Sequence, residues 1–288
     1  MSAMGRFAFW KKNTGRRELG LYLGPKSCWV VAKDSPDSGL ELPLDGDNWP
    51  ALMASISSHF GPAALAIVLG FGRYQLLLAD KPAVADNEML DAIKWAIKDM
   101  VSEPVSSLKL DYFESPNQSS NKITVVAVER SALEALVKAA DEVGSSVSGI
   151  GIEELVTARL FGSEAQARLV VSHVPGSELL FTVVKDGRLW MQRRVRGFAD
   201  LNSISEQDLS YGAADNLSLE LQRSMDYFES QLRQAPVAAI ELATEGASAA
   251  LAKLVASNFN QKVAALPPRP VGHTFAMLAC EEFMGEQA

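Results

Sequence analysis

The residue types that most often carry chemistry are sparse in this chain, and their spacing does not suit a reaction. Only three histidines occur, His59, His173 and His273, and no two of them have the spacing that a zinc site uses. The chain has no Gly-x-Ser-x-Gly elbow and no Cys–His signature, so hydrolysis by an activated nucleophile has no candidate. We therefore expect no catalytic residue and no metal site.

Glycine-rich patterns that could cradle a phosphate are incomplete. The run Gly70–Gly72 follows an expected strand, as a dinucleotide-binding fingerprint does, but Gln75 stands where the third glycine belongs. The chain that follows has strand character, whereas the fingerprint needs a helix N-terminus for the pyrophosphate. No Gly-x-x-x-x-Gly-Lys-[Ser/Thr] loop occurs either. The acidic pair Glu153-Glu154 is expected on a solvated helix face rather than in acid–base catalysis.

Composition and charge exclude several classes of protein. The 288 residues are 48% hydrophobic and 22% charged, which is typical of a globular chain of one large bilobed unit or two domains. The formal net charge is −8, which disfavours nucleic acid as a partner. Two cysteines, Cys28 and Cys280, make no disulfide framework and indicate a reducing, cytoplasmic setting.

The N-terminal segment has the chemistry of a membrane interface. Phe7, Phe9 and Trp10 lie beside Lys11 and Lys12, and aromatic and basic residues together suit the lipid–water boundary. No apolar stretch approaches the ~20 residues needed to cross a bilayer, so any membrane contact is expected to be peripheral. The alternative is an ordinary frayed end, and we expect residues 1–17 to form an N-terminal tail.

Two stretches of the chain, about 150 residues apart, share one order of elements. Each opens with strands joined by tight turns rich in Pro, Ser and Gly, which is typical of a β-meander. Each then continues with helices and further strands, and self-similarity at this distance indicates duplicated units. The first copy is expected to have strands at 19–24, 28–32, 65–69 and 74–80 and a helix within 47–60. After a helix at 153–161, the second copy is expected to have strands at 169–174, 179–185, 188–195, 237–242 and 262–266 and helices at 217–232, beyond 246 and at 274–284.

The pattern of strands ends at Lys81-Pro82, and the helix, two strands and helix that follow indicate a small α+β insert at about 81–148. Asp86 can cap its first helix. Ser131 and Glu134 form a capping box for its second. The expected buried face of the first helix is Leu90, Ile93, Ile97 and Met100. Two strands, near 108–113 and 123–128, separate the helices. Alternation of strands and helices predicts an α/β fold of two related lobes, residues 18–166 with the insert and residues 167–288.

This duplicated plan, with an insert in the first lobe, resembles the actin-like ATPases, the group that includes the bacterial division protein FtsA. The resemblance implies an actin-like, duplicated RNase H-like fold of two lobes. Two stretches, Leu108–Tyr112 after a Trp-containing helix and Leu221–Phe228, are similar to the "lDy" and "RSlDyy" stretches of PilM-type pilus assembly proteins. With Phe9–Lys12 and the length, the chain resembles the MshI-type proteins of the mannose-sensitive haemagglutinin (MSHA) pilus, a type IV pilus.

The resemblance also implies where a nucleotide would bind. Nucleotide-binding members carry Asp-x-Gly in each of two phosphate hairpins, whose carboxylates organise Mg²⁺ and water while the loop amides hold phosphates. In the first hairpin of this chain Tyr22 replaces the aspartate, Gly24 is retained and Ser27 lies in the same turn. The usual magnesium anchor of this hairpin is therefore missing.

The second hairpin and the adenosine-contacting turn depart from the pattern in the same way. His173 and Pro175 stand at the Asp and Gly positions, with Gly176 one place further, and Glu245-Gly246 replaces the Gly-Gly pair. A proline lacks a backbone donor and a carboxylate repels phosphate. What the resemblance leaves is a degenerate nucleotide site. Its residues would be Gly24, Ser27, Gly176 and Gly246. The alternative is that these glycines serve only ordinary turn and cap geometry. We expect no cofactor, and the alternative to that expectation is bound ATP and Mg²⁺.

The function that the resemblance implies is a scaffold without catalysis. PilM-type proteins lie at the cytoplasmic face of the inner membrane and bind the N-terminal cytoplasmic segment of a PilN-type membrane protein, with a PilO-type protein and the assembly ATPase as further partners. Peptide capture of this kind needs no catalytic residue, and no contact residue is assigned. Two alternatives stay open. One is an active ATP-binding or ATP-hydrolysing protein of the same fold, and the other is a membrane-surface adaptor that uses the N-terminal segment.

Overall fold

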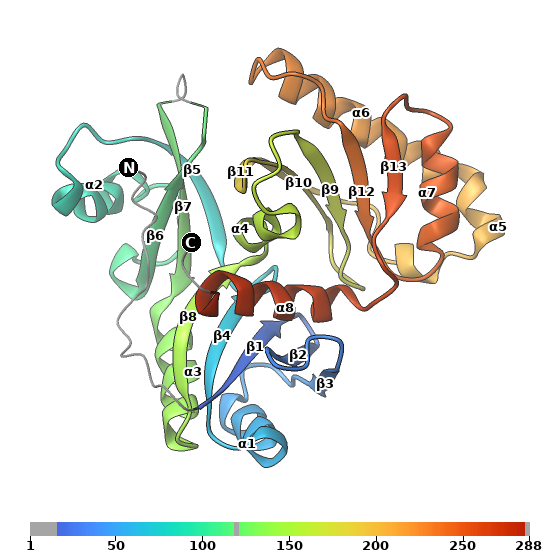
Figure 1. Ribbon diagram of the computed structural model, residues 1–288. Coiled ribbons are helices and arrows are strands. Elements are labelled where there is room, and N and C mark those ends of the chain that lie inside the picture. The colour runs from blue at the N-terminus through green and yellow to red at the C-terminus, as the bar shows by residue number, and fades with distance from the viewer. Residues whose placement is uncertain (1–15, 118–120, 286–288) are drawn as a thin grey trace. The chain divides into compact units, whose positions relative to one another are not determined.

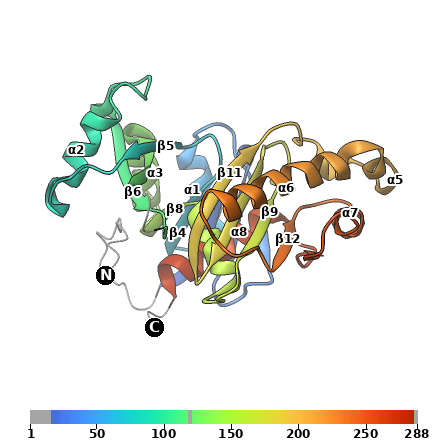
Figure 2. The same cartoon turned by 90° about the horizontal axis from the view of Figure 1, so that it is seen from above.

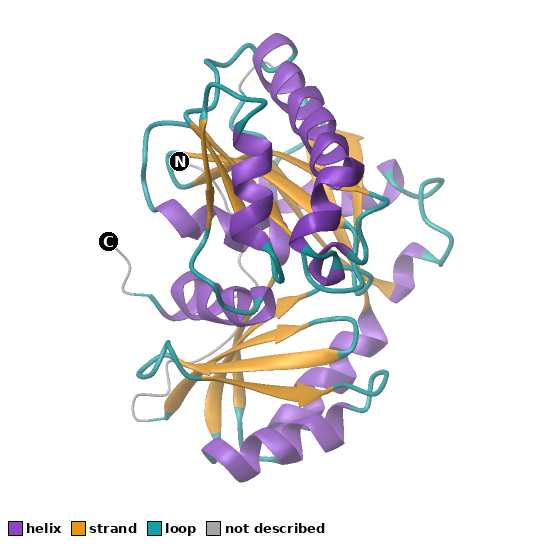
Figure 3. Cartoon of the chain, turned by 90° about the vertical axis from the view of Figure 1, so that its right-hand side faces the viewer, coloured by secondary structure: helices purple, strands orange, loops and turns teal. Residues whose placement is uncertain are grey.

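A computed structural model describes residues 16–117 and 121–285. The chain divides into two compact units: unit 1 comprises Met1–Ile152 and Ala279–Ala288, and unit 2 comprises Glu153–Leu278. Each unit has a central sheet with helices against it (Figures 1 and 3). No helix within the described ranges is both long enough and apolar enough to span a bilayer. The residues predicted to contact a membrane, Phe7, Phe9, Trp10, Lys11 and Lys12, lie outside the described residues, so that contact stays a prediction.

The sheet of unit 1 has five strands in the order β3-β2-β1-β4-β8. The first three form an antiparallel meander, and β4 and β8 continue it in parallel with β1. The strands are β1 (Arg17–Leu23), β2 (Ser27–Ala32), β3 (Gly39–Pro43), β4 (Ala63–Leu69) and β8 (Ser146–Ile152). Helices α1 (Trp49–Phe60) and α3 (Arg130–Glu142) pack against each other. Asn48, rather than Asp47, caps α1 by accepting a hydrogen bond from the Ala51 amide at 3.3 Å.

A second, three-stranded sheet in unit 1 has the order β5-β7-β6. Its strands are β5 (Gln75–Asp80), β6 (Leu108–Glu114) and β7 (Lys122–Glu129), and β5 precedes Lys81 in the chain. Helix α2 (Met89–Ala96) covers one face of this sheet and buries Met89, Ile93 and Ile97. Short 3₁₀ turns occur at Asp86–Glu88 and Val105–Ser107.

Three local predictions for this region were wrong. Leu90 and Met100 are exposed, because the helix turns Met89 inward at the start of an i, i+4, i+8 stripe. Asp86 lies in the 3₁₀ turn before α2 and its side chain caps nothing there. The capping box of α3 does not form either, since the helix begins at Arg130 and the Ser131 hydroxyl donates to the Glu129 carboxylate.

Unit 2 repeats the sheet of unit 1 with the order β11-β10-β9-β12-β13. Strands β9, β10 and β11 form the antiparallel meander, and β12 and β13 add in parallel. This repetition confirms the predicted duplication. The strands are β9 (Arg168–Ser172), β10 (Leu179–Lys185), β11 (Arg188–Val195), β12 (Ala239–Ala243) and β13 (Lys262–Ala265).

Helices α6 (Ala214–Ser230) and α7 (Ser248–Ala256) supply the core against the sheet of unit 2. The short α5 (Glu206–Asp208) and a π-helical turn (Leu209–Ala213) precede α6, which crosses the sheet in Figure 2. The helix predicted at 217–232 corresponds to α6, which buries an apolar stripe. Its members are Leu217, Leu221, Met225 and Phe228. Two further segments begin the unit, α4 (Glu153–Val156) and the 3₁₀ turn Thr157–Phe161, and α8 (Val271–Met284) ends it and continues into unit 1.

Candidate functional site

The turn between β1 and β2, predicted as the first phosphate hairpin, is closed by its own backbone. The Gly24 amide donates to the Ser27 carbonyl at 2.9 Å, so these two predicted site residues lie together in one turn. An amide bound in this way is not available to a phosphate oxygen. A Cβ on Gly24 would lie 3.0 Å from the Tyr22 ring and 3.1 Å from the Ser27 carbonyl oxygen. The close packing of the turn itself therefore favours glycine at this position.

Tyr22, at the position of the missing aspartate, is buried rather than presented to a ligand. Its hydroxyl would lie 2.8 Å from a Cβ built on Gly70, so the side chain reaches across to the end of β4. The Gly70 amide also donates to the Leu23 carbonyl at 2.9 Å. A ring packed in this manner stabilises the hairpin through burial of apolar surface and cannot coordinate a cation as a carboxylate would.

Arg73 holds the same turn from outside, and its role was not predicted. Its guanidinium donates to the carbonyl oxygens of Leu23 and Gly24, both at 3.2 Å. It also pairs with Asp47 at 2.7 Å and lies 5.0 Å from the ring centroid of Trp49. Arginine suits this position because one planar group carries several donors. The sequence offered no signal for it, since its partners lie between 24 and 50 positions away.

The second predicted hairpin, between β9 and β10, is also closed by internal hydrogen bonds. The amides of His173, Gly176 and Ser177 donate to the carbonyl oxygens of Ala243, Ala199 and Val174, each at 3.0 Å. Gly176 has a φ of +79° with open space where a Cβ would point, so the turn needs glycine for its backbone conformation alone. Pro175 carries no N–H. Three amides of this loop therefore already donate to carbonyl oxygens, and Pro175 offers no amide donor at all.

His173 replaces the second aspartate with a buried imidazole. The side chain has no exposed surface, and neither ring nitrogen has a hydrogen-bond partner of good geometry among the described residues. Burial lowers the pKa of His173, and the nearby backbone of Ala199 and Ser177 offsets part of that effect. The ring is therefore neutral at pH 7 and brings no charge to the loop.

The Glu245-Gly246 turn serves the fold in two ways. The Glu245 carboxylate accepts a hydrogen bond at 2.9 Å from the amide of Val271, the first residue of α8, where a negative charge suits the helix N-terminus. Gly246 has a φ of +77°, and a Cβ there would lie 2.2 Å from the Asn202 carbonyl oxygen. Gly176 and Gly246 both lie against the segment 199–202, which occupies the space beside these turns.

The acidic pair Glu153-Glu154 was predicted on a solvated face, and this was wrong. Both side chains are buried, and both bind the guanidinium of Arg194 on β11, at 2.5 Å and 2.7 Å. Two buried carboxylates need such a partner because an unpaired charge away from water is costly. The pair therefore anchors α4 to the sheet of unit 2.

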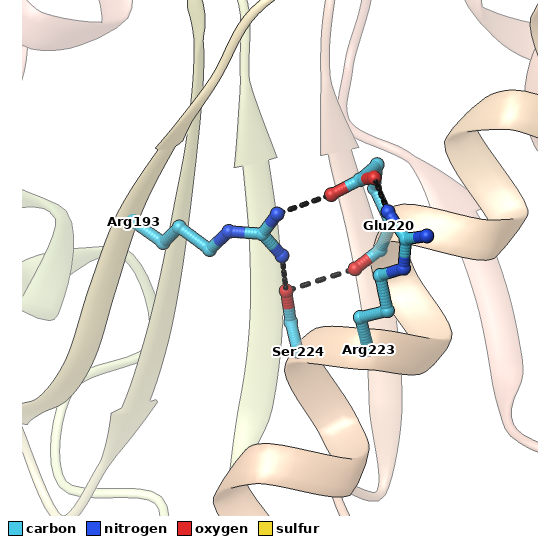
Figure 4. Close-up of polar contacts among 4 residues, drawn as sticks. All are labelled: Arg193, Glu220, Arg223 and Ser224. Atoms are coloured by element: carbon cyan, nitrogen blue, oxygen red, sulfur yellow. Dashed lines mark hydrogen bonds and ion pairs between the residues drawn. The ribbon is translucent and has the colours of Figure 1, made fainter.

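The stretch of α6 that resembles the "RSlDyy" motif also makes structural contacts (Figure 4). Ser224 accepts a hydrogen bond from Arg193 of β11 at 3.2 Å and donates to the backbone carbonyl of Glu220 at 2.9 Å. The Glu220 carboxylate accepts hydrogen bonds from the guanidinium groups of both Arg193 and Arg223. This network fastens α6 to the edge strand of the sheet. Among the described residues, no group of three or more His, Cys, Asp or Glu side chains could hold a metal ion.

Comparison with solved structures identifies the fold. A PilM–PilN type IV pilus biogenesis complex matches with a TM-score of 0.65 at 14% identity, over 94% of this chain and 99% of that chain. The cytoplasmic domain of EpsL, an inner membrane component of the type II secretion system of Vibrio cholerae, matches with 0.56 at 16% identity, over 94% and 96%. A protein of unknown function with an actin-like ATPase fold from Bacteroides thetaiotaomicron matches with 0.54 at 11% identity, over 92% and 96%.

This chain has the actin-like ATPase fold. The predicted fold class is therefore confirmed, with a duplicated sheet and an insert carried by the first of the two copies. No protein-family model matches the sequence, and no curated protein matches it. At identities of 11–16% the likeness to these structures establishes the fold and leaves the function to be argued from the chain's own residues.

Proposed function

We propose that this chain is a PilM-like scaffold of a type IV pilus assembly platform at the cytoplasmic face of the inner membrane. In this role it binds the N-terminal cytoplasmic segment of a PilN-type inner-membrane protein. The observation that carries the proposal is the shared fold with a PilM–PilN complex over nearly the full length of both chains. The resemblance of Leu108–Tyr112 and Leu221–Phe228 to PilM-type stretches supports it independently.

The finer assignment is to the MSHA pilus, with the chain in the MshI role. It rests on the N-terminal Phe9–Lys12 and on chain length. A PilO-type protein and the assembly ATPase belong to the same proposal as further partners of the platform. The MSHA assignment is tested by asking whether the PilN-type protein of that pilus system, and not one from another system, binds the chain.

We further propose that the chain is a pseudo-ATPase. The two positions that would anchor magnesium hold the buried side chains Tyr22 and His173. Amides of both hairpins donate to carbonyl groups of their own unit, and the Glu245 carboxylate is engaged with the start of α8. Phosphoryl transfer depends on an acidic side chain that positions the metal and on hydrogen-bond donors aimed at the phosphates. The hairpins lack the acidic side chains, and their backbone amides already donate to carbonyl groups of the protein.

Binding of the partner is tested with the purified full chain and a fluorescently labelled synthetic peptide of the partner's cytoplasmic N-terminal segment. Fluorescence anisotropy should rise saturably with protein concentration. A peptide of the same composition in scrambled order is the control and should leave the anisotropy unchanged. Equal behaviour of the two peptides, or no rise with either, would refute the scaffold proposal.

Nucleotide binding is tested on the same protein by thermal unfolding with ATP and Mg²⁺. A ligand that binds only the folded state raises the free energy of unfolding by about 2.7 kcal/mol when its concentration is a hundred times its Kd. We expect no shift with nucleotide and a clear upward shift with the partner peptide. A nucleotide-dependent shift would contradict the pseudo-ATPase proposal while leaving the peptide result to stand by itself.

A further inference from the structure

Helix α6 exposes large apolar side chains on the side that points away from the core of unit 2. Leu219 is 51% exposed and Tyr227 50% exposed, while Tyr211, in the π-helical turn just before the helix, is 84% exposed. Single exposed apolar residues are ordinary, but several along one helix indicate a surface that another molecule covers. The buried stripe of the same helix already accounts for its packing against the sheet.

Leu219 and Tyr227 lie on one i, i+4 ridge of the helix. Asp215, Leu219, Arg223 and Tyr227 succeed one another at intervals of four along α6. Tyr211 does not continue this ridge, because the backbone at Tyr211 and Gly212 is non-helical. Ridges of the i±4n kind are those through which two helices interdigitate, at a crossing angle of about −50°.

The ridge is complementary to itself. A two-fold axis at Leu219 sets this residue against its own copy, and it sets Asp215 of each chain opposite Arg223 of the other. An isologous interface requires this property, because each contact must occur twice with the roles exchanged. The contacts are apolar at the centre and oppositely charged on either side.

The charges on the ridge are available for such pairing. Asp215 is exposed and makes no ion pair within the part of the chain that the structure describes. The side chain of Arg223 binds Glu220 on the same helix through one nitrogen and remains 58% exposed. A guanidinium has five N–H donors, so the bond to Glu220 leaves donors for a second carboxylate.

We propose that two copies of this chain associate through antiparallel α6 helices centred on Leu219. The ridge from Asp215 to Tyr227 is about 18 Å long at 1.5 Å per residue. One helix pair of this length covers less than the ~800 Å² per partner of a standard interface. The dimer is therefore weak and exchanges with monomer at micromolar protein concentration. The inference does not depend on the proposed partner peptide.

Sedimentation equilibrium of the full chain, over roughly 1 to 100 µM, tests the proposal. The wild type should show a reversible monomer–dimer equilibrium. Leu219→Glu sets two like charges on the axis and should weaken association by at least about tenfold. Leu78→Glu is the matched control, because Leu78 on β5 is also an exposed leucine, at 63%, and its substitution should leave association unchanged. A wild type that stays monomeric, or a dimer that survives Leu219→Glu, would overturn the proposal.

A charge-exchange experiment tests the register. Asp215→Arg alone and Arg223→Asp alone should each weaken association, since like charges then face each other. Mixing the two variants should restore it as a heterodimer, because both opposite-charge contacts are re-formed between unlike chains. A mixture that associates no better than its components would refute the antiparallel register. Arg223→Asp also removes the bond to Glu220, so circular dichroism must show that it is folded, and Leu219→Glu tests the surface without that change.

Discussion

Gly246→Ala separates the two explanations for a glycine at this position, which are access for a nucleotide and packing of the fold. Two penalties apply to the alanine. A φ of +77° is left-handed and costs an L-residue about 1–2 kcal/mol. The new methyl group would also lie 2.2 Å from the carbonyl oxygen of Asn202, more than about 1 Å inside normal contact. Displacing backbone in a packed region costs a further 1–3 kcal/mol, roughly.

Gly176→Ala is the matched control for this substitution. Its φ of +79° carries the same backbone penalty, but nothing lies within 4 Å of the added methyl group. We therefore expect Gly176→Ala to lower the free energy of unfolding by about 1–2 kcal/mol and Gly246→Ala by about 2–5 kcal/mol. In a unit of this size each kcal/mol shifts the melting temperature by roughly 2–4 °C or more. Gly246→Ala should thus melt clearly lower than Gly176→Ala.

Thermal unfolding followed by circular dichroism measures this difference, and a parallel series with ATP and Mg²⁺ completes the experiment. If Gly246 were present to admit a phosphate, alanine would abolish a nucleotide-dependent shift and leave the stability near that of Gly176→Ala. Equal melting temperatures for the two variants would therefore refute the packing argument.

Two further substitutions test the electrostatics of the chain. Arg194→Met leaves Glu153 and Glu154 buried without their cation and should lower the free energy of unfolding by about 3–5 kcal/mol, whereas Arg196→Met, at a side chain 90% exposed, should change it by less than about 0.5 kcal/mol. Urea unfolding compares the pair, and equal midpoints would contradict the burial argument. Burial raises the pKa of Asp111 to about 6, so the folded state keeps a proton that the unfolded chain releases, and stability falls as pH rises from about 4 to about 6. Asp111→Asn should therefore be more stable than the wild type by about 1–2 kcal/mol above pH 7, after allowance for solvent screening, and equal to it below pH 4. A difference that does not vary with pH would refute the titration of this group.

Local patterns predicted the elements that local chemistry decides. The predicted strands at 179–185 and 188–195 leave two residues between them, and these, Asp186 and Gly187, both have positive φ, at 53° and 65°, as a two-residue hairpin turn requires. Helix α6 could be predicted at 217–232, because its buried apolar residues recur over several full turns of a 17-residue helix. The duplication of the sheet could be inferred for the same reason, since each meander carries its own turn residues.

Strand β8 could not be predicted, because its sequence has the wrong composition for a strand. Its Gly149 lowers strand propensity and offers no side chain to pack. The structure supplies the reason, since the Phe283 ring lies 2.2 Å from the place that a Cβ on Gly149 would take. The side chain of Phe283, 134 positions further along the chain, thus leaves no room for a side chain at position 149. Glu153 and Glu154 present the same difficulty, because burial of the pair depends on Arg194, about 40 positions further along the chain.

The candidate site shows why glycines are weaker evidence for phosphate binding than acids are. Gly24 and Gly246 stand where the nucleotide-binding proteins that the sequence resembles carry glycine, and each has a packing reason, the Tyr22 ring in one case and the Asn202 backbone in the other. Those reasons persist whether or not a nucleotide binds, because the turns must close in either case. An aspartate that anchors magnesium has no comparable duty in the fold, since a buried carboxylate without a cation destabilises the protein. Loss of the ligand therefore removes the reason for the aspartates, whereas the packing reasons for Gly24 and Gly246 persist. The acid positions are for this reason the ones that discriminate a scaffold from an ATPase in this fold.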